Sequence, residues 1–315
     1  MKTMLVCGAT GFIGKNVVQY FKDKKKYNIR AVYHNKPPSH NMKVEWVQAN
    51  LNNVEDVNRV MKGVDIVVQM AATTSGARDI INRPHIHVTD NAVMNSLLLR
   101  SAFDNNVEHF IFPSCTVMYQ PNNTAIQETD FDQNKDLLSK YFGVGNTKVY
   151  IEKMCKFYSR LGKTKHTVIR QSNIYGPHDK YDLEKSHVFG ATITKVMSST
   201  NGIVSVWGSG EEKRDLLHVN DLVRFIEKAI ENQKIPFGLY NVGLNSAISI
   251  NDLVTKIIKK SGKKLKVSRD LSQPTIKTNV CLDCTRAKTD LGWQPVISLD
   301  EGIENTLNWY KENIQ

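Results

Sequence analysis

The first 115 residues alternate between short apolar runs and longer stretches with helical spacing. The apolar runs have the length of buried strands and lie at 3–7, 29–33, 44–48, 64–70 and 109–112. The stretches with helical spacing lie at 15–22, 54–61 and 88–105. Strands that alternate with helices form parallel β-α-β units. The pattern therefore predicts an α/β fold with a doubly wound parallel sheet of the Rossmann type.

Beyond residue 115 the pattern is less regular. A helix is predicted at 147–161 and a strand at 167–170, and polar loops then surround 176–186, 198–202 and 208–213. Further helices, separated by short strands, are predicted at 219–232, 250–261 and 299–313. We expect a Rossmann domain at 1–172, rejoined by about 216–245, and a smaller α/β lobe made of 173–215 and 246–315.

The composition is that of an ordinary globular protein. Hydrophobic residues make up 41% of the 315 residues and charged residues 23%. The apolar runs are far shorter than the ~20 residues that span a bilayer, and Met1-Lys2-Thr3 does not begin a signal-peptide pattern. Five scattered cysteines fit a reducing compartment. We therefore expect a soluble, cytoplasmic protein without a membrane partner.

Charge and cysteine spacing change this picture little. The net charge is +11, but Lys and Arg are spread along the chain and no RNA- or DNA-binding module surrounds them. We therefore expect no nucleic-acid partner, and a basic surface also attracts a substrate that carries a diphosphate. Cys281 and Cys284 have the CxxC spacing, but no second pair of ligands follows, so no metal is expected.

Three glycines follow the first predicted strand. Gly8, Gly11 and Gly14 lie between that strand and the first helix. Glycines in this context permit a tight turn and a close approach of the backbone to a pyrophosphate, whose charge the helix amino end stabilises. The motif therefore predicts a site for a nicotinamide dinucleotide.

The end of the second predicted strand indicates which dinucleotide binds. Rossmann proteins that prefer NAD usually carry an acidic residue there, which binds the ribose hydroxyls. Here the strand ends in Val32-Tyr-His-Asn-Lys36, without a carboxylate. Since a neutral-to-basic turn accommodates a 2′-phosphate, we expect NADP, with NAD as the alternative.

Further motifs carry a resemblance to a known family. They are Ala71-Ala72, Lys148 within a predicted helix, NIYGPHD at 173–179, EKSHV at 184–188, WGSG at 207–210, RDLLHVND at 214–221, and a tail at 282–302. With the glycine spacing, they resemble the nucleotide-sugar branch of the extended short-chain dehydrogenase/reductase family, and within it the GDP-L-fucose synthases, which are GDP-4-keto-6-deoxymannose epimerase/reductases. The resemblance covers essentially the whole chain. It implies NAD(P)-dependent reduction, dehydrogenation or epimerisation of a nucleoside-diphosphate sugar, GDP-linked by this resemblance, in the synthesis of deoxysugars or surface-glycan precursors.

The resemblance also implies roles for individual residues. It places the cofactor at Gly8, Thr10, Gly11, Phe12, Ile13, Gly14, His34, Asn50, Leu51, Ala71, Ala72 and Lys148. It places the nucleotide sugar at Asn173, His187, Val188, Trp207 and Arg214, which would make the smaller lobe the nucleotide-sugar-binding lobe. Lys148 would hold the nicotinamide ribose, His187 would act as an acid in epimerisation, and Asn91 would support the active-site helix.

The chain departs from this family at its catalytic tyrosine. The family uses a serine, a tyrosine and a lysine, and the tyrosine hydroxyl exchanges a proton with the sugar oxygen. Val144 occupies the tyrosine position, four residues before Lys148. Aligned without gaps, Cys115 falls at the serine position and Val117 at the epimerase cysteine; a shift by one residue would place Ser114 at the serine position instead.

Two tyrosines near Lys148 are candidates to replace the missing one. Tyr141 lies seven residues before Lys148 and would share its face on a continuous helix. Gly143 and Gly145 intervene, however, and are residues that can break a helix. Tyr150 lies two residues beyond Lys148 and would point elsewhere.

The leading hypothesis is an enzyme acting on a GDP-linked sugar. His187 would serve as general acid/base, Lys148 as cofactor anchor, and Cys115 or Thr116 as the polar contact to the reacting oxygen. Cys115 could itself act as an acid or base if its surroundings shifted its pKa. The alternative is a catalytically reduced protein that binds the nucleotide sugar and the dinucleotide, which the loss of the tyrosine favours.

The same resemblance implies a homodimer. The family often pairs two long helices from each subunit in a four-helix bundle. The helices predicted at 88–105 and 147–161 are the candidates here.

Overall fold

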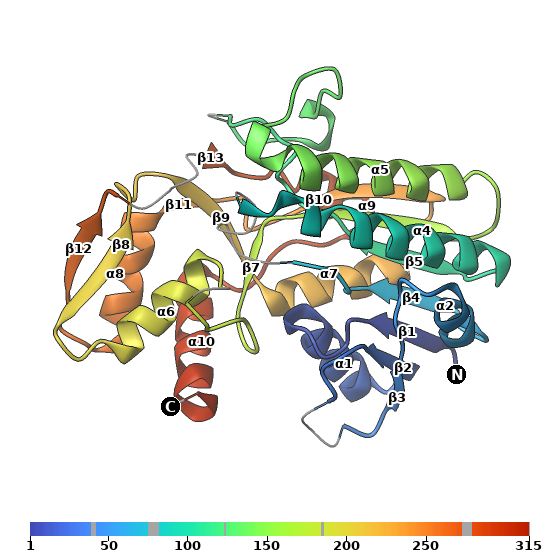
Figure 1. Cartoon of the computed structure of the whole chain (residues 1–315), viewed down its shortest axis with the longest axis horizontal. Helices are drawn as coiled ribbons and strands as arrows, with labels where there is room; N and C mark the ends of the chain where they lie inside the picture. Colours follow the sequence, from blue (N-terminus) through green and yellow to red (C-terminus); the bar gives the residue numbers. More distant parts are fainter. Residues whose placement is uncertain (39–41, 75–81, 123, 184–185, 273–278, 315) are drawn as a thin grey trace.

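A seven-stranded parallel sheet is the main element of the computed structural model, which describes residues 1–38, 42–74, 82–122, 124–183, 186–272 and 279–314. Its strands are β1 (Thr3–Cys7), β2 (Asn28–Tyr33), β3 (Glu45–Gln48), β4 (Ile66–Gln69), β5 (His109–Pro113), β6 (Lys165–Gln171) and β10 (Phe237–Val242). They are ordered β10-β6-β5-β4-β1-β2-β3, and every pairing is parallel (Figure 1). The strand order reverses beside β1, the place where doubly wound sheets bind their ligands.

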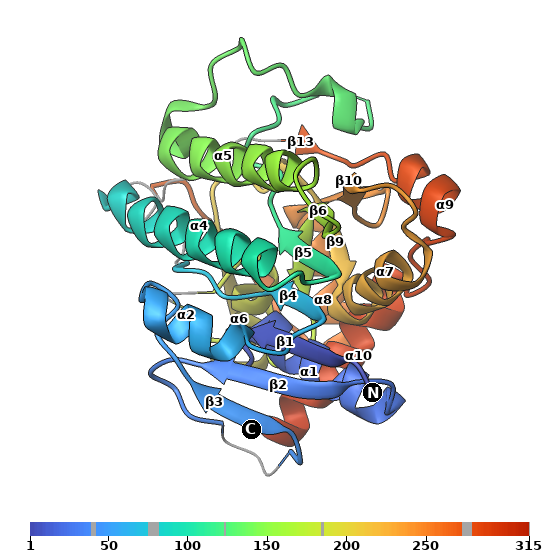
Figure 2. The same ribbon diagram turned by 90° about the vertical axis from the view of Figure 1, so that its right-hand side faces the viewer.

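Helices cover both faces of this sheet, as Figure 2 shows. One face packs against α1 (Phe12–Lys24), α7 (Val219–Asn232) and α9 (Thr285–Leu291), and the other against α2 (Val54–Met61), α4 (Thr89–Asp104) and α5 (Phe142–Tyr158). Consecutive strand residues point to opposite faces, so Met4 and Val6 enter the first core while Leu5 and Cys7 enter the second. This double burial explains why the strands are apolar runs rather than alternating ones.

The rest of the chain builds a smaller lobe, seen at the left of Figure 1. A four-stranded sheet contains β7 (Asn173–Tyr175), β9 (Lys213–His218), β11 (Ala247–Ser249) and β13 (Asn279–Val280), and β8 (Ile203–Trp207) pairs with β12 (Lys266–Asp270). The helices α6 (Val188–Ser198), α8 (Ile250–Ser261) and α10 (Leu299–Asn313) complete a third apolar core. Short 3-10 turns lie at Pro84–His87 (η1), Glu128–Asp130 (η2) and Ser139–Tyr141 (η3).

The predicted fold class is confirmed, and α5 differs from its prediction. The helix expected to begin at residue 147 begins at Phe142 and runs unbroken through Gly143 and Gly145. Neighbouring side chains pack closely against the helix at these glycines. A Cβ on Gly145 would lie 2.6 Å from Leu137 Cδ1, and one on Gly143 would lie 3.0 Å from Val88 Cγ2.

Membrane-spanning helices were searched for in the part of the chain that the structure describes. No helix there combines the length and the apolar character needed to cross a bilayer.

Candidate functional site

The turn after β1 has no room for side chains. A Cβ on Gly8 would lie 2.7 Å from the backbone of Ala71, and one on Gly14 would lie 2.1 Å from the Gly8 carbonyl oxygen. Gly8 also has a φ of +66°, a conformation that favours glycine. The N–H of Gly11 donates to the Gly8 carbonyl at 3.0 Å. This cradle of exposed backbone fits a pyrophosphate, which must approach the chain closely.

The helix that follows presents a free amino end. Gly11 is the N-cap of α1, no side chain caps it, and its first turn contains no acidic residue. Beside it lies a pocket of about 360 Å³, at the carboxyl ends of β1, β2 and β4. Most of the residues expected at the cofactor line this pocket: Gly8, Thr10, Gly11, His34, Asn50, Leu51, Ala71 and Ala72. The uncapped N–H groups and the pocket together suit an anionic ligand.

The remaining residues expected at the cofactor do not line the pocket. Phe12, Ile13 and Gly14 form the first turn of α1, and Lys148 lies in α5. The expected residues therefore lie along the carboxyl edge of the sheet: most line the pocket, three form the first turn of α1, and Lys148 contacts the end of β5.

Two lysines lie near each other beside the pocket, and one of them lines it. Lys36 lines it, next to His34 and Asn35, after the end of β2. Burial lowers the pKa of the Lys15 ammonium group, and the positive charge of Lys36 lowers it further. Two ammonium groups that repel each other favour an anion between them. Sequence reasoning missed Lys15, although its place directly after the last glycine of the motif was a usable signal.

The two residues after β5 have different surroundings. Ser114 is 3% exposed, and its hydroxyl donates to Glu152 Oε1 at 2.5 Å. Glu152 in turn pairs with Arg170 at 2.7 Å in a buried ion pair. Cys115 is half-buried and interacts electrostatically with Lys148. The hydroxyl of Ser114 is therefore held in the interior, and the geometry favours the gap-free alignment with Cys115 at the serine position.

Lys148 projects from α5 toward the end of β5. Its Nζ donates to the Pro113 carbonyl at 2.8 Å and lies 4.7 Å from the centre of the Phe112 ring. Burial lowers the pKa of Lys148, and Cys115 opposes this effect. Burial raises the pKa of the Cys115 thiol, and Lys148 opposes it. The two groups therefore form an electrostatically coupled pair, with Thr116 half-buried beside it.

The position at which the resemblance places the catalytic tyrosine holds a side chain that cannot exchange a proton. Val144 is half-buried in the first turn of α5 and has no proton to exchange. Tyr141 is the N-cap of the same helix, and it interacts electrostatically with Arg214 and Cys115.

The smaller lobe faces the cofactor pocket through the segment before α6. Lys180 Nζ contacts Thr74 Oγ1 at 3.5 Å, just after β4, and sequence reasoning did not single out this lysine. His187 is the exposed N-cap of α6; desolvation lowers the pKa of its ring, and the positive charge of Lys180 lowers it further. Burial raises the pKa of the Asp179 carboxyl to about 7. Polar and titratable groups therefore gather where the two lobes meet.

The other residues expected at the sugar nucleotide lie on several elements. Asn173 donates from Nδ2 to the Asp215 carbonyl at 3.2 Å, so it lies beside Arg214 on the neighbouring strand β9. Trp207 ends β8 in the two-stranded sheet, is 45% exposed, and has the Lys195 ammonium 5.3 Å from its ring centre.

Val188 and Asn91 are the last of the expected residues. Val188 is the first residue of α6, and the motif residues Glu184 and Lys185 lie outside the described residues. Asn91 holds the loop after β4, because its side chain accepts from the Thr73 N–H at 3.0 Å and donates to the His87 carbonyl at 2.9 Å.

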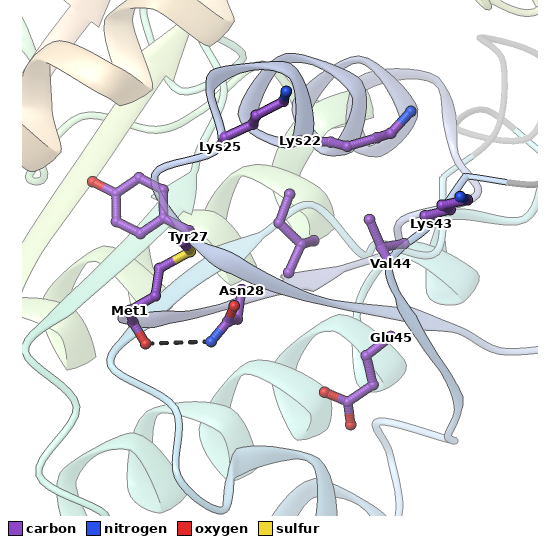
Figure 3. Close-up of a pocket in the computed structure, with 9 residues that line it drawn as sticks. Met1, Lys22, Lys25, Tyr27, Asn28, Lys43, Val44 and Glu45 are labelled. Atoms are coloured by element: carbon purple, nitrogen blue, oxygen red, sulfur yellow. Dashed lines mark hydrogen bonds between the residues drawn. The ribbon is translucent and has the colours of Figure 1, made fainter.

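A second hollow lies at the opposite edge of the sheet. Its volume is about 560 Å³. Figure 3 shows it beneath Lys22 and Lys25, near the hydrogen bond from Asn28 to the Met1 carbonyl. It is larger than the pocket beside Gly8, but β2 and β3 begin there, and ligands of such sheets bind where parallel strands end. We therefore assign the site to the carboxyl edge.

Comparisons with known proteins show which family the chain resembles. The profile of the family described as "NAD dependent epimerase/dehydratase family" matches residues 4–243. The chain is 26% identical to a dTDP-4-dehydro-6-deoxy-D-allose reductase of Streptomyces bikiniensis, over 99% of this chain and 97% of that protein. It is 28% identical to a GDP-L-fucose synthase of Azorhizobium caulinodans, over 98% and 96%. A UDP-glucose 4-epimerase of Thermotoga maritima, solved with UDP-glucose, superposes with a TM-score of 0.88 at 25% identity, over 99% of this chain and 100% of that one.

Proposed function

The chain belongs to the NAD dependent epimerase/dehydratase family, and on that basis we propose that it is an NADP-dependent enzyme that reduces, oxidises or epimerises the sugar of a GDP-linked nucleotide sugar. The observation that carries this proposal is the pocket beside Gly8, which the uncapped end of α1 adjoins. Relatives of this chain are named for acting on dTDP- and GDP-linked sugars, which supports the substrate class.

Bound NADPH would supply hydride to a sugar carbonyl, or NADP⁺ would accept it from a hydroxyl-bearing carbon. The residues of the chain position the reactants and move protons. The backbone of Gly8, Gly11 and the first turn of α1 would hold the pyrophosphate. Lys148, fixed by the Pro113 carbonyl at 2.8 Å, would bind the nicotinamide ribose. Cys115 would hydrogen-bond the reacting oxygen of the sugar.

The sugar nucleotide would lie between this edge and the smaller lobe. Arg214 would bind its diphosphate and Asn173 would orient it, both from adjacent strands. His187, the N-cap of α6, would exchange a proton with a sugar carbon during epimerisation. Trp207 would stack on the nucleobase.

The preference for NADP is supported by the lysine pair. Lys15 and Lys36 together offer two positive charges to a 2′-phosphate, whereas NAD brings no charge to this place. We expect NADP to bind more tightly than NAD, and Lys36→Gln to weaken NADP binding while it leaves NAD binding unchanged. Isothermal titration with both dinucleotides measures the two affinities.

We also propose a homodimer through an apolar surface on α4 and α5, which lie side by side in both views (Figures 1 and 2). The surface consists of Val93 on α4, Tyr150 and Phe157 on α5, and Leu161 just after α5, which are 40–53% exposed. An apolar surface of this kind is typical of a protein interface.

The test begins with the purified protein and the nucleotides that co-purify with it. NADPH absorbance and sugar products are then followed with GDP-4-keto-6-deoxymannose and with UDP-, dTDP- and CDP-linked keto-sugars. Consumption of NADPH with formation of a new sugar supports the enzyme, and Lys148→Ala should then abolish turnover. Tight binding of dinucleotide and sugar without any chemistry would overturn it in favour of a binding protein.

A further inference from the structure

We propose that Tyr141 supplies the phenol that the chain lacks at position 144, and that it donates a proton to the sugar oxygen from the side of Arg214 rather than from the side of Lys148. This inference rests on the proposed function. It assigns a catalytic residue outside the spacing that the family's tyrosine obeys.

The backbone places Tyr141 at the start of an unbroken helix. Its N–H donates to the Leu138 carbonyl at 2.7 Å, which closes the short turn η3 before α5. Because α5 continues without a break from residue 142, Tyr141 and Lys148 are seven residues apart on nearly the same face. Seven residues correspond to a rise of about 10 Å, so the two side chains start about two turns apart along that face.

The segment before Tyr141 is packed against the loop that carries Cys115. A Cβ on Gly145 would lie 2.6 Å from Leu137 Cδ1 and 3.8 Å from Val117 Cγ2. The missing side chain at Gly145 therefore lets Leu137 lie over the helix, next to the loop after β5. This contact explains how the segment 137–141 is held close to residue 115.

Two segments far apart in the sequence contribute to the surroundings of Tyr141. Arg214 on β9 and Cys115 after β5 both interact with it electrostatically. Burial raises its pKa, so that it stays protonated at neutral pH, and the Arg214 guanidinium opposes this by favouring the phenolate. Arg214 would thus stabilise the phenolate left after proton donation, the effect that the family obtains from lysine.

The neighbouring hydroxyl groups are occupied elsewhere. Ser114 donates to Glu152 at 2.5 Å. Tyr119 donates to Asn241 Oδ1 at 2.7 Å inside the core. Tyr150 is 43% exposed on the outer face of α5, where its hydroxyl lies 3.1 Å from Ser96 Oγ. These three hydroxyl groups therefore have partners of their own, whereas Tyr141 interacts electrostatically with Cys115 and Arg214.

The proposed step balances as follows. A hydride adds to the carbonyl carbon of the sugar, and the π electrons of the C=O bond move to its oxygen. The O–H bond of Tyr141 breaks and a sugar O–H bond forms, after which the phenolate takes a proton from water. The sugar is reduced and the dinucleotide is oxidised; dehydrogenation follows the same path in reverse.

The activity test compares three variants. Tyr141→Phe removes only the hydroxyl and should lower kcat by roughly 10²–10⁴-fold, the usual contribution of a positioned acid. Tyr158→Phe is the matched control, because its ring packs at the far end of α5 against Phe103 at 5.7 Å, and its kcat should equal that of the unmodified protein. Adding Val144→Tyr to Tyr141→Phe restores the phenol at the family position and should recover turnover.

A second measurement does not depend on turnover. With tyrosine labelled at ¹³Cζ, the resonance missing from Tyr141→Phe identifies Tyr141, and unreactive GDP-mannose serves as the probe. Saturating GDP-mannose should shift this resonance and leave that of Tyr158 in place. An unshifted Tyr141 resonance with GDP-mannose bound, or full turnover by Tyr141→Phe, would overturn the inference while the proposed function stands. If neither GDP-mannose nor any keto-sugar binds, the proposed function and this inference both fail.

Discussion

Single residues in the turn after β1 decide whether a dinucleotide can bind. Gly14 has the least space, because a Cβ there would lie 2.1 Å from the Gly8 carbonyl oxygen. We expect Gly14→Ala to weaken NADPH binding by about tenfold or more, equivalent to roughly 1.4 kcal/mol. Titration of NADPH fluorescence measures the affinity. Gly63→Ala is the control, since nothing lies within 4 Å of its added methyl group, although its φ of +71° disfavours alanine.

The control separates a general loss of stability from a steric block at the pyrophosphate site. Gly63→Ala should lose some stability and keep its NADPH affinity. Equal affinities of Gly14→Ala and the unmodified protein would contradict the position assigned to the pyrophosphate.

The carboxyl group of Asp179 makes stability depend on pH. Burial raises its pKa to about 7, whereas an unfolded aspartate has a pKa of about 3.9. Its contribution to stability is therefore complete below pH 4 and is lost as the pH rises to 7. Asp179→Asn cannot ionise, so at pH 8 it should be more stable than the unmodified protein by about 1.4 kcal/mol or more, the free energy of one pKa unit.

Urea unfolding at pH 4 to 8 checks this prediction. The difference between Asp179→Asn and the unmodified protein should grow with pH across this range. Asp23→Asn, at an exposed carboxyl group on α1, should give a profile parallel to that of the unmodified protein. A difference that is independent of pH would show that Asp179 does not titrate as described.

The sequence predicted which residues lie at the site better than it predicted where their side chains point. The pocket beside Gly8 contains the residues expected from the glycine motif and from the end of β2. Whether Ser114 or Cys115 occupies the serine position could not be decided, because both directly follow the same strand. The answer depends on Glu152, which accepts from Ser114 and lies 38 residues further along the chain.

At the level of elements, α5 and β6 are joined by the ion pair of Glu152 and Arg170, whose side chains are 7% and 4% exposed. Removal of one partner leaves a buried charge, so Glu152→Leu and Arg170→Met should each cost about 3–5 kcal/mol of unfolding free energy. The double variant should cost less than the sum of the two, because no unpaired charge is left behind. Urea unfolding of the four proteins gives the coupling energy, and strictly additive losses would contradict it.

The amphipathic helices were predicted with the bounds that the structure shows, whereas the more buried helix α6 was not predicted. α7, α8 and α10 match their predictions because one apolar stripe faces a core and the other face is polar. α6 was not predicted: its sequence VFGATITKVMS contains a glycine and several β-branched residues, which are poor helix formers. Packing against β8 and α8, rather than local preference, stabilises it.

At the level of the whole molecule, the apolar surface on α4 and α5 predicts the oligomeric state. Phe157→Glu introduces a charge into the middle of this surface and should convert a dimer to a monomer that still binds NADPH. Sedimentation equilibrium measures the mass. Leu271→Glu, at a residue that is 75% exposed in the smaller lobe, should leave the mass unchanged. A monomer already present in the unmodified protein at micromolar concentration would rule out the dimer.

The place of β10 in the sheet has a consequence for synthesis on the ribosome. β10 pairs with β6, yet it begins about 70 residues later, after much of the smaller lobe has emerged. At about 5–20 residues per second, translation takes several seconds to cover this distance. During that interval the nascent chain carries β6 as an open sheet edge, whose unpaired backbone is a template for pairing with another chain. Slow translation between residues 171 and 237 therefore prolongs the period in which aggregation competes with folding.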